Sequence, residues 1–421
     1  MEAFVKEIAR SIYVQRLSDR RENGLVKVIT GLRRAGKSYL LFKLYYDYLI
    51  TSGVAEDHII GIELDDERHE DLRDTKRLRS YIEEQIVDSA MYYLFIDEIQ
   101  LVGRFEGLLN GLGRKPNLDI YVTGSNSRFL STDILTEFRG RGDEVRVHPL
   151  SFGEYLSAYE GTEEEAWREY YTYGGLPLIL SRESDELKAT YLDTLLEKVY
   201  ISDIVDRNNL RGPAVMDSLL NILASSVGSL TNPYKLANTF RSQGVGGVTD
   251  KTLSAYIDHL LDAFLINRAH RYDVKGKQYI ASPHKYYFED VGLRNARLNF
   301  RQQEENHIME NIIYNELRMR GFAVDVGVVD LWESVGGKQI KKRTEIDFVC
   351  NLGSRRYYIQ SAFSIPDSEK MRQESRPLVA VSDSFKKIIV VKDPIKLWRS
   401  EDGVVVMGLR EFLLDPDSLD R

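Results

Sequence analysis

The 421-residue chain is predicted to be an α/β protein, because three features of its first 150 residues indicate a parallel sheet. Apolar runs alternate there with helical stretches, and strands that alternate with helices usually pair in parallel. A glycine-rich segment joins the first apolar run to the next helical stretch, and the third run ends in two carboxylates. The predicted strands are Leu25–Thr30, His58–Leu64, Tyr92–Ile96 and Leu118–Thr123.

The composition is that of an ordinary globular protein, with 43% hydrophobic and 29% charged residues. A net charge of −8 argues against a surface coated in nucleic acid, although a local basic face is compatible with it. No stretch approaches about 18 apolar residues, and no apolar run follows a basic start, so we expect neither a membrane span nor a signal peptide. Cys350 is the single cysteine, which excludes an intrachain disulfide and fits a cytoplasmic location.

A phosphate-binding motif follows the first predicted strand. The segment Gly31–Ser38 matches G-x-x-x-x-G-K-S and lies between a strand and a helical stretch, as this motif requires. Its glycines let backbone N–H groups point at phosphates, Lys37 would reach the β- and γ-phosphates, and Ser38 would bind Mg²⁺. ATP and Mg²⁺ are therefore the expected cofactors. The residues expected to bind the nucleotide are Gly31, Leu32, Arg33, Arg34, Ala35, Gly36, Lys37, Ser38 and Tyr39.

Two other predicted strands end in polar residues that suit the same chemistry. Asp97 and Glu98 follow the strand Tyr92–Ile96, where Asp97 is placed to hold Mg²⁺ and Glu98 to polarise an attacking water. Ser125 and Asn126 follow the next strand, and we expect one of them, with Asn126 preferred, to face the γ-phosphate or the water.

Two arginines flanked by glycine, Arg139 and Arg141, come next in the chain. An arginine in such a mobile segment can complete the nucleotide site of a neighbouring subunit, which would make the protein a homo-oligomer. An ordinary solvated loop arginine is the alternative interpretation, and the spacing by itself favours neither.

Several of these motifs, together and in this order, resemble those of the prokaryotic AAA-like (AAA_14) P-loop ATPases that carry a DUF4143 carboxy-terminal region. The resemblance spans most of the chain. Within the pattern of that family, Arg141 is a better candidate than Arg139 for an arginine finger. The motifs that carry the resemblance are Thr30–Ser38, Phe95–Gln100, Thr123–Asn126, Gly140–Arg141, Pro149–Tyr155, Tyr173–Pro177 and Lys285–Leu293.

The resemblance implies an ATPase core followed by three further parts. Residues 1–155 would form the core, residues 156–212 a helical lid, residues 213–298 a winged-helix-like module, and residues 299–421 a nuclease-like α/β domain of the DUF4143 type.

The pattern of residues 213–298 also predicts a winged helix, independently of the resemblance. Pro233–Gln243 and the stretch after Asp250 have helical spacing, a glycine turn separates them, and a hairpin follows at Leu265–Tyr272 and Gln278–Ala281. The outward face of the second helix is not strongly basic, so the hairpin is the better candidate for contact with DNA phosphates. A protein-binding or purely structural module is the alternative. The cationic residues of the hairpin are Arg268, His270, Arg271, Lys275 and Lys277.

The last part resembles the PD-(D/E)xK nucleases but departs from their pattern. Glu310 on a helix and Asp347 on a strand match the first two metal-binding positions. Gln360 and Ala362 stand where a carboxylate and a lysine are needed, so we expect no nuclease activity. Whether the three residues Glu310, Asp347 and Gln360 bind a metal is left open.

The sequence thus predicts ATP hydrolysis, with Glu98 activating the water, Asn126 positioning it and Arg141 completing the site from a neighbour. Two other functions are compatible with the motifs. One is a nucleotide-dependent switch or scaffold that acts on protein partners without DNA. The other is a small-molecule kinase, against which the carboxy-terminal half argues because it offers no evident substrate pocket.

Overall fold

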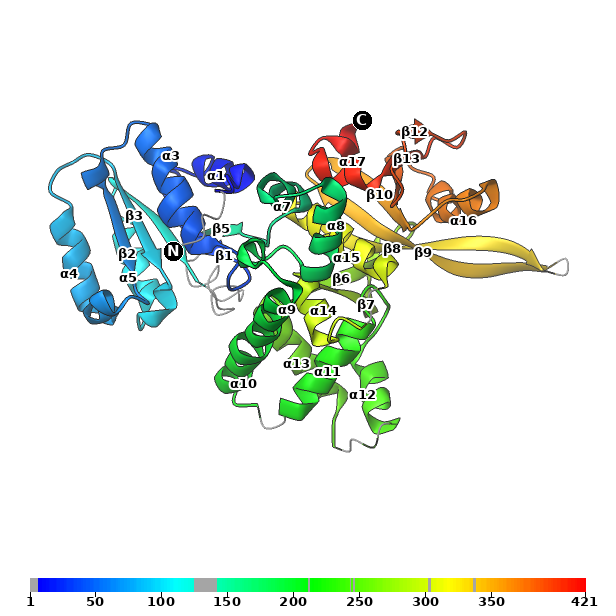
Figure 1. Cartoon of the computed structure of the whole chain (residues 1–421), viewed down its shortest axis with the longest axis horizontal. Coiled ribbons are helices and arrows are strands. Elements are labelled where there is room, and N and C mark those ends of the chain that lie inside the picture. Colours follow the sequence, from blue (N-terminus) through cyan, green and yellow to red (C-terminus); the bar gives the residue numbers. More distant parts are fainter. Residues whose placement is uncertain are drawn as a thin grey trace. The chain divides into compact units, whose positions relative to one another are not determined.

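The computed structural model describes residues 7–124, 142–210, 213–242, 244, 247–301, 304–335 and 338–421. The chain forms two compact units (Figure 1). The first comprises Met1–Leu150, Leu176–Ser181 and Asp262–Phe264, and the second comprises Ser151–Gly175, Arg182–Leu261 and Leu265–Arg421. None of the helices in these described ranges is long and apolar enough to span a lipid bilayer.

The first unit is built on a five-stranded, wholly parallel sheet in the order β2-β3-β4-β1-β5. The four strands expected from the apolar runs are confirmed to within about one residue. β5 was not predicted, because its residues are mostly polar and only partly buried. The strands are β1 (Val26–Thr30), β2 (Ile59–Glu63), β3 (Tyr92–Asp97), β4 (Leu118–Thr123) and β5 (Gly142–Arg146).

Helices surround this sheet. A continuous helical run follows the glycine-rich loop and consists of α2 (Lys37–Tyr39), the π-helical η1 (Leu40–Tyr45) and α3 (Tyr46–Thr51). The remaining helical elements are α1 (Ser11–Ser18), η2 (Glu56–His58), η3 (Glu67–Arg73), α4 (Thr75–Gln85), η4 (Ile99–Leu101), α5 (Phe105–Leu112) and η6 (Pro177–Ser181).

One face of this sheet is purely apolar. Alternate residues of the central strands, such as Val28, Leu94 and Ile120, pack with Ile82 of α4 and Leu109 of α5 in a single buried cluster. The period of two along a strand places every second side chain on this face, so the residues between them face the opposite side.

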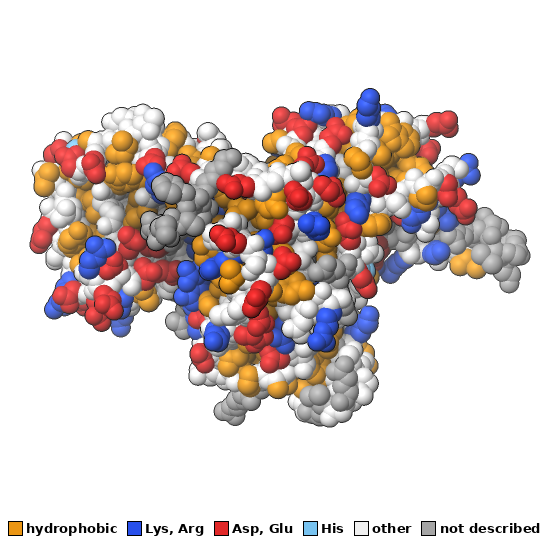
Figure 2. All heavy atoms as spheres, viewed as in Figure 1, with side chains coloured by type: hydrophobic (Ala, Val, Ile, Leu, Met, Phe, Trp, Pro, Cys, Tyr) orange, Lys and Arg blue, Asp and Glu red, His pale blue; other side chains and the backbone are white. Residues whose placement is uncertain are grey.

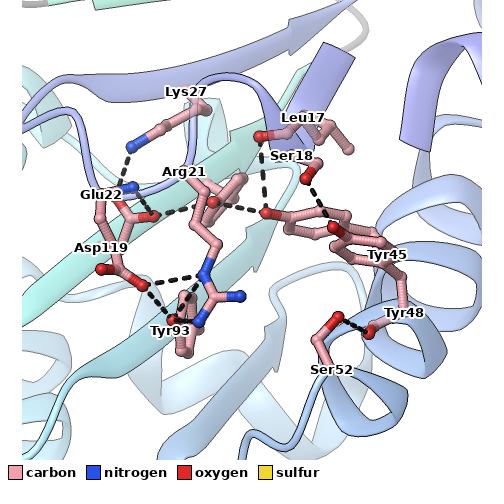
Figure 3. Close-up of polar contacts among 11 residues, drawn as sticks. Leu17, Ser18, Arg21, Glu22, Lys27, Tyr45, Tyr48, Ser52, Tyr93 and Asp119 are labelled. Carbon is pink, nitrogen blue, oxygen red and sulfur yellow. Dashed lines mark hydrogen bonds and ion pairs between the residues drawn. The ribbon is translucent and has the colours of Figure 1, made fainter. Parts of the chain in front are cut away.

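The other face buries a charged pair near the amino ends of the strands. Lys27 of β1 and Asp119 of β4 form an ion pair with almost no exposure (Figure 3). Asp119 also accepts hydrogen bonds from the backbone N–H of Glu22 at 2.9 Å and from the hydroxyl of Tyr121 at 2.7 Å. The hydroxyl of Tyr121 lies 2.8 Å from that of Tyr45 in the helical run after the glycine-rich loop. Because buried charges are costly unless paired, this network holds that run on the sheet.

The second unit contains a mixed, eight-stranded sheet in the order β12-β13-β11-β10-β9-β8-β6-β7. The long hairpin β8–β9 extends beyond the rest of this sheet (Figure 1). The strands are β6 (Ile266–Asp273), β7 (Gln278–Phe288), β8 (Ala323–Val335), β9 (Lys338–Leu352), β10 (Arg355–Ala362), β11 (Lys386–Val391), β12 (Trp398–Arg399) and β13 (Val405–Gly408).

The second unit also contains helices. They are α7 (Phe152–Ala158), α8 (Glu163–Tyr173), α9 (Asp185–Thr194), η7 (Leu195–Ile201), α10 (Ser202–Arg207), α11 (Pro213–Ser225), α12 (Pro233–Ser242), α13 (Asp250–Asp262), α14 (Val291–Arg297), α15 (Glu305–Met319), α16 (Ser368–Val379), α17 (Leu409–Leu414) and η8 (Ser418–Asp420).

The hairpin expected as a wing, β6–β7, forms after α12 and α13, but it is not a free-standing ribbon. β6 pairs in parallel with β8, with Arg271 opposite Val326 and Asp273 opposite Val328. The hairpin therefore belongs to the same sheet as the strands after residue 322. Local sequence predicts a hairpin but does not encode the strand that pairs with its outer edge.

Candidate functional site

The glycine-rich loop between β1 and α2 has a backbone that requires its glycines. Gly31 has φ of 132°, and a Cβ atom there would lie 2.0 Å from the carbonyl oxygen of Val147. Gly36 has φ of 92° and immediately precedes Lys37, the first residue of α2. Positive φ values and such a close backbone approach exclude other residues. The loop is thereby fixed at the carboxyl end of β1 with the start of a helix beside it.

Lys37 is 5% exposed, and its side chain turns back over the loop. Its ammonium group donates to the carbonyl oxygens of Gly31 and Leu32, both at 3.1 Å. Burial lowers the pKa of Lys37 to about 8, against the opposing influence of the Glu98 and Asp97 carboxylates. A buried cation whose hydrogen-bond acceptors are neutral carbonyls gains from an incoming anion, so the lysine is poised for phosphate.

The carboxyl ends of β3 and β4 bring three polar side chains together. Asp97 ends β3 and is 4% exposed, and it accepts a hydrogen bond from the hydroxyl of Thr123 at the end of β4. Burial raises the pKa of Asp97, while hydrogen bonds from Thr123 and Ser38 act in the opposite direction. The backbone N–H of Glu98 donates to the same Thr123 oxygen at 3.2 Å. Thr123 therefore orients both carboxylate residues, a role that the strand-end pattern alone did not reveal.

Glu98 has a left-handed backbone with φ of 50°, which turns the chain sharply after β3. Its carboxylate accepts a hydrogen bond from the side-chain amide of Gln100. A left-handed conformation is uncommon for a residue other than glycine and is often found where function constrains the backbone.

A cavity of about 460 Å³ opens at this edge of the sheet within the first unit. Its polar part is lined by Lys37, Ser38, Asp65, Asp97 and Glu98, and its apolar part by Ile8, Leu150, Pro177 and Leu178. The volume of the cavity falls in the range of small-molecule sites. Its charged part suits the phosphates of a nucleoside triphosphate, and its apolar part suits the base. Asp65, which follows β2, was missed because nothing in the sequence marks it.

The predicted nucleotide-binding residues divide into two groups in the structure. Arg33, Arg34, Gly36, Lys37, Ser38 and Tyr39 line the cavity, whereas Gly31, Leu32 and Ala35 are buried and do not line it. Ser125, Asn126, Arg139 and Arg141 lie outside the described residues, so their predicted roles stay predictions.

Mg²⁺ fits the donors present at this site. The hydroxyl of Ser38 and the carboxylate of Asp97 are close enough to share a hydrogen bond. Mg²⁺ prefers such hard oxygen ligands, commonly one or two carboxylates together with substrate phosphates and water.

Arg10, which no motif identifies, supports the phosphate loop from beneath. Its guanidinium group donates to the carbonyl oxygens of Ala35 at 2.9 Å and His148 at 2.7 Å, and it stacks over the ring of Tyr13. The side chain is 6% exposed and lines the cavity. Arg10 thus joins the loop to the segment that follows β5.

The Tyr173–Pro177 motif acquires a structural explanation in the second unit. Buried Asp290 accepts hydrogen bonds from the backbone N–H groups of Gly175 at 2.7 Å and Leu293 at 3.1 Å. A Cβ atom on Gly292 would lie 2.0 Å from the carbonyl oxygen of Tyr173. The two glycine-containing motifs therefore pack against each other. The chain then continues to Pro177, which lines the cavity of the first unit.

The structure also brings together the residues expected at a nuclease-like site, but around a lysine. Glu310 of α15 and Asp347 of β9 both contact the ammonium group of Lys285 on β7. The side-chain oxygen of Gln360 accepts a 3.4 Å hydrogen bond from the backbone N–H of Asp347, and Ala362 is buried. Among the described residues, no group of three or more His, Cys, Asp or Glu side chains is arranged to hold a metal ion.

The cationic residues of the β6–β7 hairpin are only partly available. Arg268 pairs with Asp258 at 2.7 Å, and Arg271 pairs with Glu345 at 3.4 Å. Lys275 and Lys277 at the turn are exposed. Acidic and basic side chains are interspersed over the face shown in Figure 2, without a broad basic surface. The phosphate-binding potential of the hairpin is therefore concentrated at its turn.

Comparison with known proteins identifies an AAA domain at residues 23–156 and a domain of unknown function, DUF8612, at residues 164–304. The expected DUF4143 designation is therefore not confirmed, because the model that matches beyond the AAA domain is a different one. The short motifs that supported the resemblance do not by themselves separate such families.

Two relatives extend over most of the chain. An uncharacterized protein of Haemophilus influenzae is 33% identical over 413 residues, which cover 97% of this chain and 98% of that protein. An uncharacterized protein of Methanocaldococcus jannaschii is 27% identical over 374 residues, covering 85% and 79% respectively. Among solved structures, the Aeropyrum pernix ORC1 protein in complex with DNA matches 70% of this chain and 93% of its own at 13% identity, with a TM-score of only 0.32.

The parallel sheet, the phosphate loop and the match at residues 23–156 show that the first unit contains a P-loop domain of the AAA class. The chain belongs to the same family as the Haemophilus influenzae protein, with which it shares almost its whole length.

Proposed function

We propose that this protein hydrolyses ATP in the presence of Mg²⁺ at the cavity of the first unit. The observation that carries the proposal is the convergence of Lys37, Ser38, Asp97 and Glu98 on one cavity at the carboxyl ends of the strands. A phosphate-binding lysine and a carboxylate that can accept a proton, both on one cavity, are the groups that phosphoryl transfer to water needs.

In this mechanism each residue has one task. Lys37 exchanges its carbonyl partners for phosphate oxygens and neutralises charge on the γ-phosphate. Ser38 and Asp97 would hold Mg²⁺, which when bound supplies further neutralisation of phosphate charge. Glu98 accepts a proton from the attacking water as its oxygen bonds to the γ-phosphorus and the bond to the β–γ bridging oxygen breaks.

The positions of the two carboxylates depend on Thr123, which contacts both residues. The side-chain amide of Gln100 donates a hydrogen bond to the Glu98 carboxylate and orients it. The proposal keeps Asn126 as the residue that positions the water and Arg141, in preference to Arg139, as an arginine supplied by a neighbouring subunit of a homo-oligomer. An Arg141→Ala protein that loses activity and regains it in mixed oligomers with Lys37→Ala protein would support action between subunits.

The proposal assigns residues 1–155 to the ATPase core and residues 156–212 to a helical lid. It assigns residues 213–298 to a winged-helix-like module and residues 299–421 to a nuclease-like domain without nuclease activity. Gln360 and Ala362 support the absence of cleavage, since neither supplies the charge of the residue it replaces.

Coupling of ATP turnover to DNA is the second part of the proposal. It is supported by the succession of α12, α13 and the β6–β7 hairpin, whose turn carries the exposed Lys275 and Lys277. The internal ion pairs of Arg268 and Arg271 favour the alternative, a nucleotide-dependent switch that acts on protein partners.

Steady-state ATP hydrolysis with Mg²⁺, measured with and without single- and double-stranded DNA, tests both parts. Lys37→Ala protein serves as the blank because it lacks the phosphate-binding cation. Turnover above the blank is expected, and turnover equal to the blank would overturn the proposed activity. Stimulation by DNA would support coupling, whereas indifference to DNA together with no binding at low salt would favour the protein-directed switch.

A further inference from the structure

The buried lysine Lys285 lies far from the phosphate loop in the sequence, and its partners differ from those of Lys37. The ammonium group of Lys285 lies 2.9 Å from Oε1 of Glu310 and 3.2 Å from Oδ1 of Asp347. The exposed fractions of the three side chains are 6%, 14% and 13%. Each comes from a different element, β7, α15 and β9 respectively, so only the folded unit assembles the cluster.

The two carboxylates have further hydrogen-bond donors of their own. The hydroxyl of Tyr287 donates to Oε1 of Glu310 at 2.7 Å, the same oxygen that Lys285 contacts. The backbone N–H of Ser361 donates to Oδ2 of Asp347 at 3.0 Å. The lysine thus faces one oxygen of each carboxylate, while neighbouring groups fix the direction in which those oxygens point.

A third carboxylate increases the demand for positive charge here. Glu345 lies two residues before Asp347 on β9, and its charge acts on Lys285. Arg271 pairs with Glu345 from β6 at 3.4 Å. Three acidic groups therefore share two cations, and carboxylates this deeply buried are strongly destabilising without such compensation. The one charge of Lys285 contacts Glu310 and Asp347 together and compensates both.

This arrangement has the form of a site for a divalent cation, except that its cation is covalently part of the chain. Mg²⁺ and Mn²⁺ are commonly held by one or two carboxylates with water completing the shell. We propose that Lys285 is the resident cation of this carboxylate site, which excludes a divalent ion from the native protein, and that removal of its ammonium group uncovers a divalent-cation site on Glu310 and Asp347.

A dissolved metal ion would not displace the lysine, for two reasons. The ammonium group is tethered, so it competes at a high effective concentration and loses little freedom on binding. A divalent ion would have to shed part of its hydration shell and tolerate a positive charge at contact distance. The identity of this cation was not predicted because Lys285 precedes Glu310 by 25 residues and lies outside the E-x-K positions.

The test is binding of Mn²⁺ followed by electron paramagnetic resonance, on the full chain without nucleotide. Lys285→Met removes the ammonium group and keeps an unbranched side chain of similar shape, and it is expected to gain one Mn²⁺ site that is at least about tenfold tighter than any in the wild type. The double variant Lys285→Met/Asp347→Asn is expected to lose that site. Lys275→Met, the same change at an exposed lysine of the same hairpin, is the matched control and gains nothing.

Thermal unfolding gives a second reading of the same variants. Millimolar Mn²⁺ is expected to raise the melting temperature of Lys285→Met by several degrees and to leave the wild type and Lys275→Met unchanged, because a ligand of the folded state stabilises it. Failure of Lys285→Met to acquire any Mn²⁺ site would overturn the proposal.

The wild type provides a test that does not require the variant to fold. If the wild type binds Mn²⁺ without nucleotide at a site that Asp347→Asn abolishes and Asp97→Asn preserves, a metal already occupies the carboxylate cluster and the proposal is wrong. Equal Mn²⁺ binding by wild type and Asp347→Asn is the expected result.

Discussion

Two of the buried lysines of this protein, Lys37 in the first unit and Lys285 in the second, are each 5% exposed but have opposite electrostatic settings. Lys37 donates to two neutral backbone carbonyls, and burial lowers its pKa to about 8. Lys285 donates to two carboxylates, whose charges raise its pKa in spite of burial. The first lysine gains from an arriving anion, whereas the second has already found its counterions.

The partners of the two lysines distinguish a ligand-binding site from a structural ion cluster. A cation that is buried with neutral acceptors is destabilising until a ligand arrives, and such incomplete compensation is typical of functional positions. A cation enclosed by carboxylates stabilises the folded state, and its charge is already compensated without an added ligand. Variants of the two units test this contrast.

The largest effect is expected for Glu98→Gln, which should reduce kcat for ATP hydrolysis by roughly 10²–10⁴ while nucleotide binding is retained. The amide keeps the size of the side chain but cannot accept the proton of the attacking water. Steady-state kinetics and binding of a fluorescent ATP analogue measure the two properties separately. Glu345→Gln, the same change in the carboxylate cluster of the second unit, should leave kcat unchanged. Wild-type turnover by Glu98→Gln would show that another group acts as the base.

Stability should distinguish the two lysines directly. Lys285→Met leaves buried carboxylates without their cation and should reduce the free energy of unfolding by about 3–5 kcal/mol. Lys37→Met removes a charge whose acceptors are neutral, so its effect should stay within about 1 kcal/mol. Urea unfolding of the two variants without nucleotide provides the measurement. Equal losses of unfolding free energy in the two variants would contradict the view that Lys285, unlike Lys37, stabilises the fold through its charge.

The lowered pKa of Lys37 predicts a pH dependence of ATP binding. The phosphate requires the charged lysine, so ATP affinity should fall as the pH rises through about 8, and binding at pH 8 should take up roughly half a proton. Calorimetry in buffers of different ionisation enthalpy measures this uptake. Lys37→Arg stays charged throughout and should remove the uptake. Lys285 should not contribute, because its pKa is shifted upward.

The smallest effect is expected at the turn of the β6–β7 hairpin. If this turn contacts DNA, Lys275→Ala and Lys277→Ala should each weaken binding modestly and reduce the salt dependence by about one phosphate contact. Binding isotherms at several salt concentrations measure both quantities. Lys396→Ala, at another exposed lysine of the second unit, is the control. Unchanged affinity in both hairpin variants would remove the main support for DNA contact through this element.

Much of the first unit could be predicted from the sequence because its signals are local. The runs that became β1 to β4 are apolar along their length, as is typical of strands buried on both faces. The phosphate loop is recognisable since its backbone needs glycine at fixed spacing and lysine and serine immediately after. β5 and the contributions of Arg10 and Thr123 were missed, because each acts through a contact with a segment distant in the sequence. Asp65 was missed because only the fold places it at the cavity.

The α/β core, the position of the phosphate loop and the carboxylates that follow β3 can be recognised from the residues alone, because helix and strand periodicity and the motif are properties of neighbouring residues. Long-range packing was needed to reveal that β6 pairs with β8, that Asp290 binds the Gly174–Gly175 turn, and that Lys285 lies between Glu310 and Asp347. Those outcomes depend on which distant segments share the buried space. A charge in the protein interior is costly without a counterion or hydrogen bonds, and the local sequence does not specify which residue provides them.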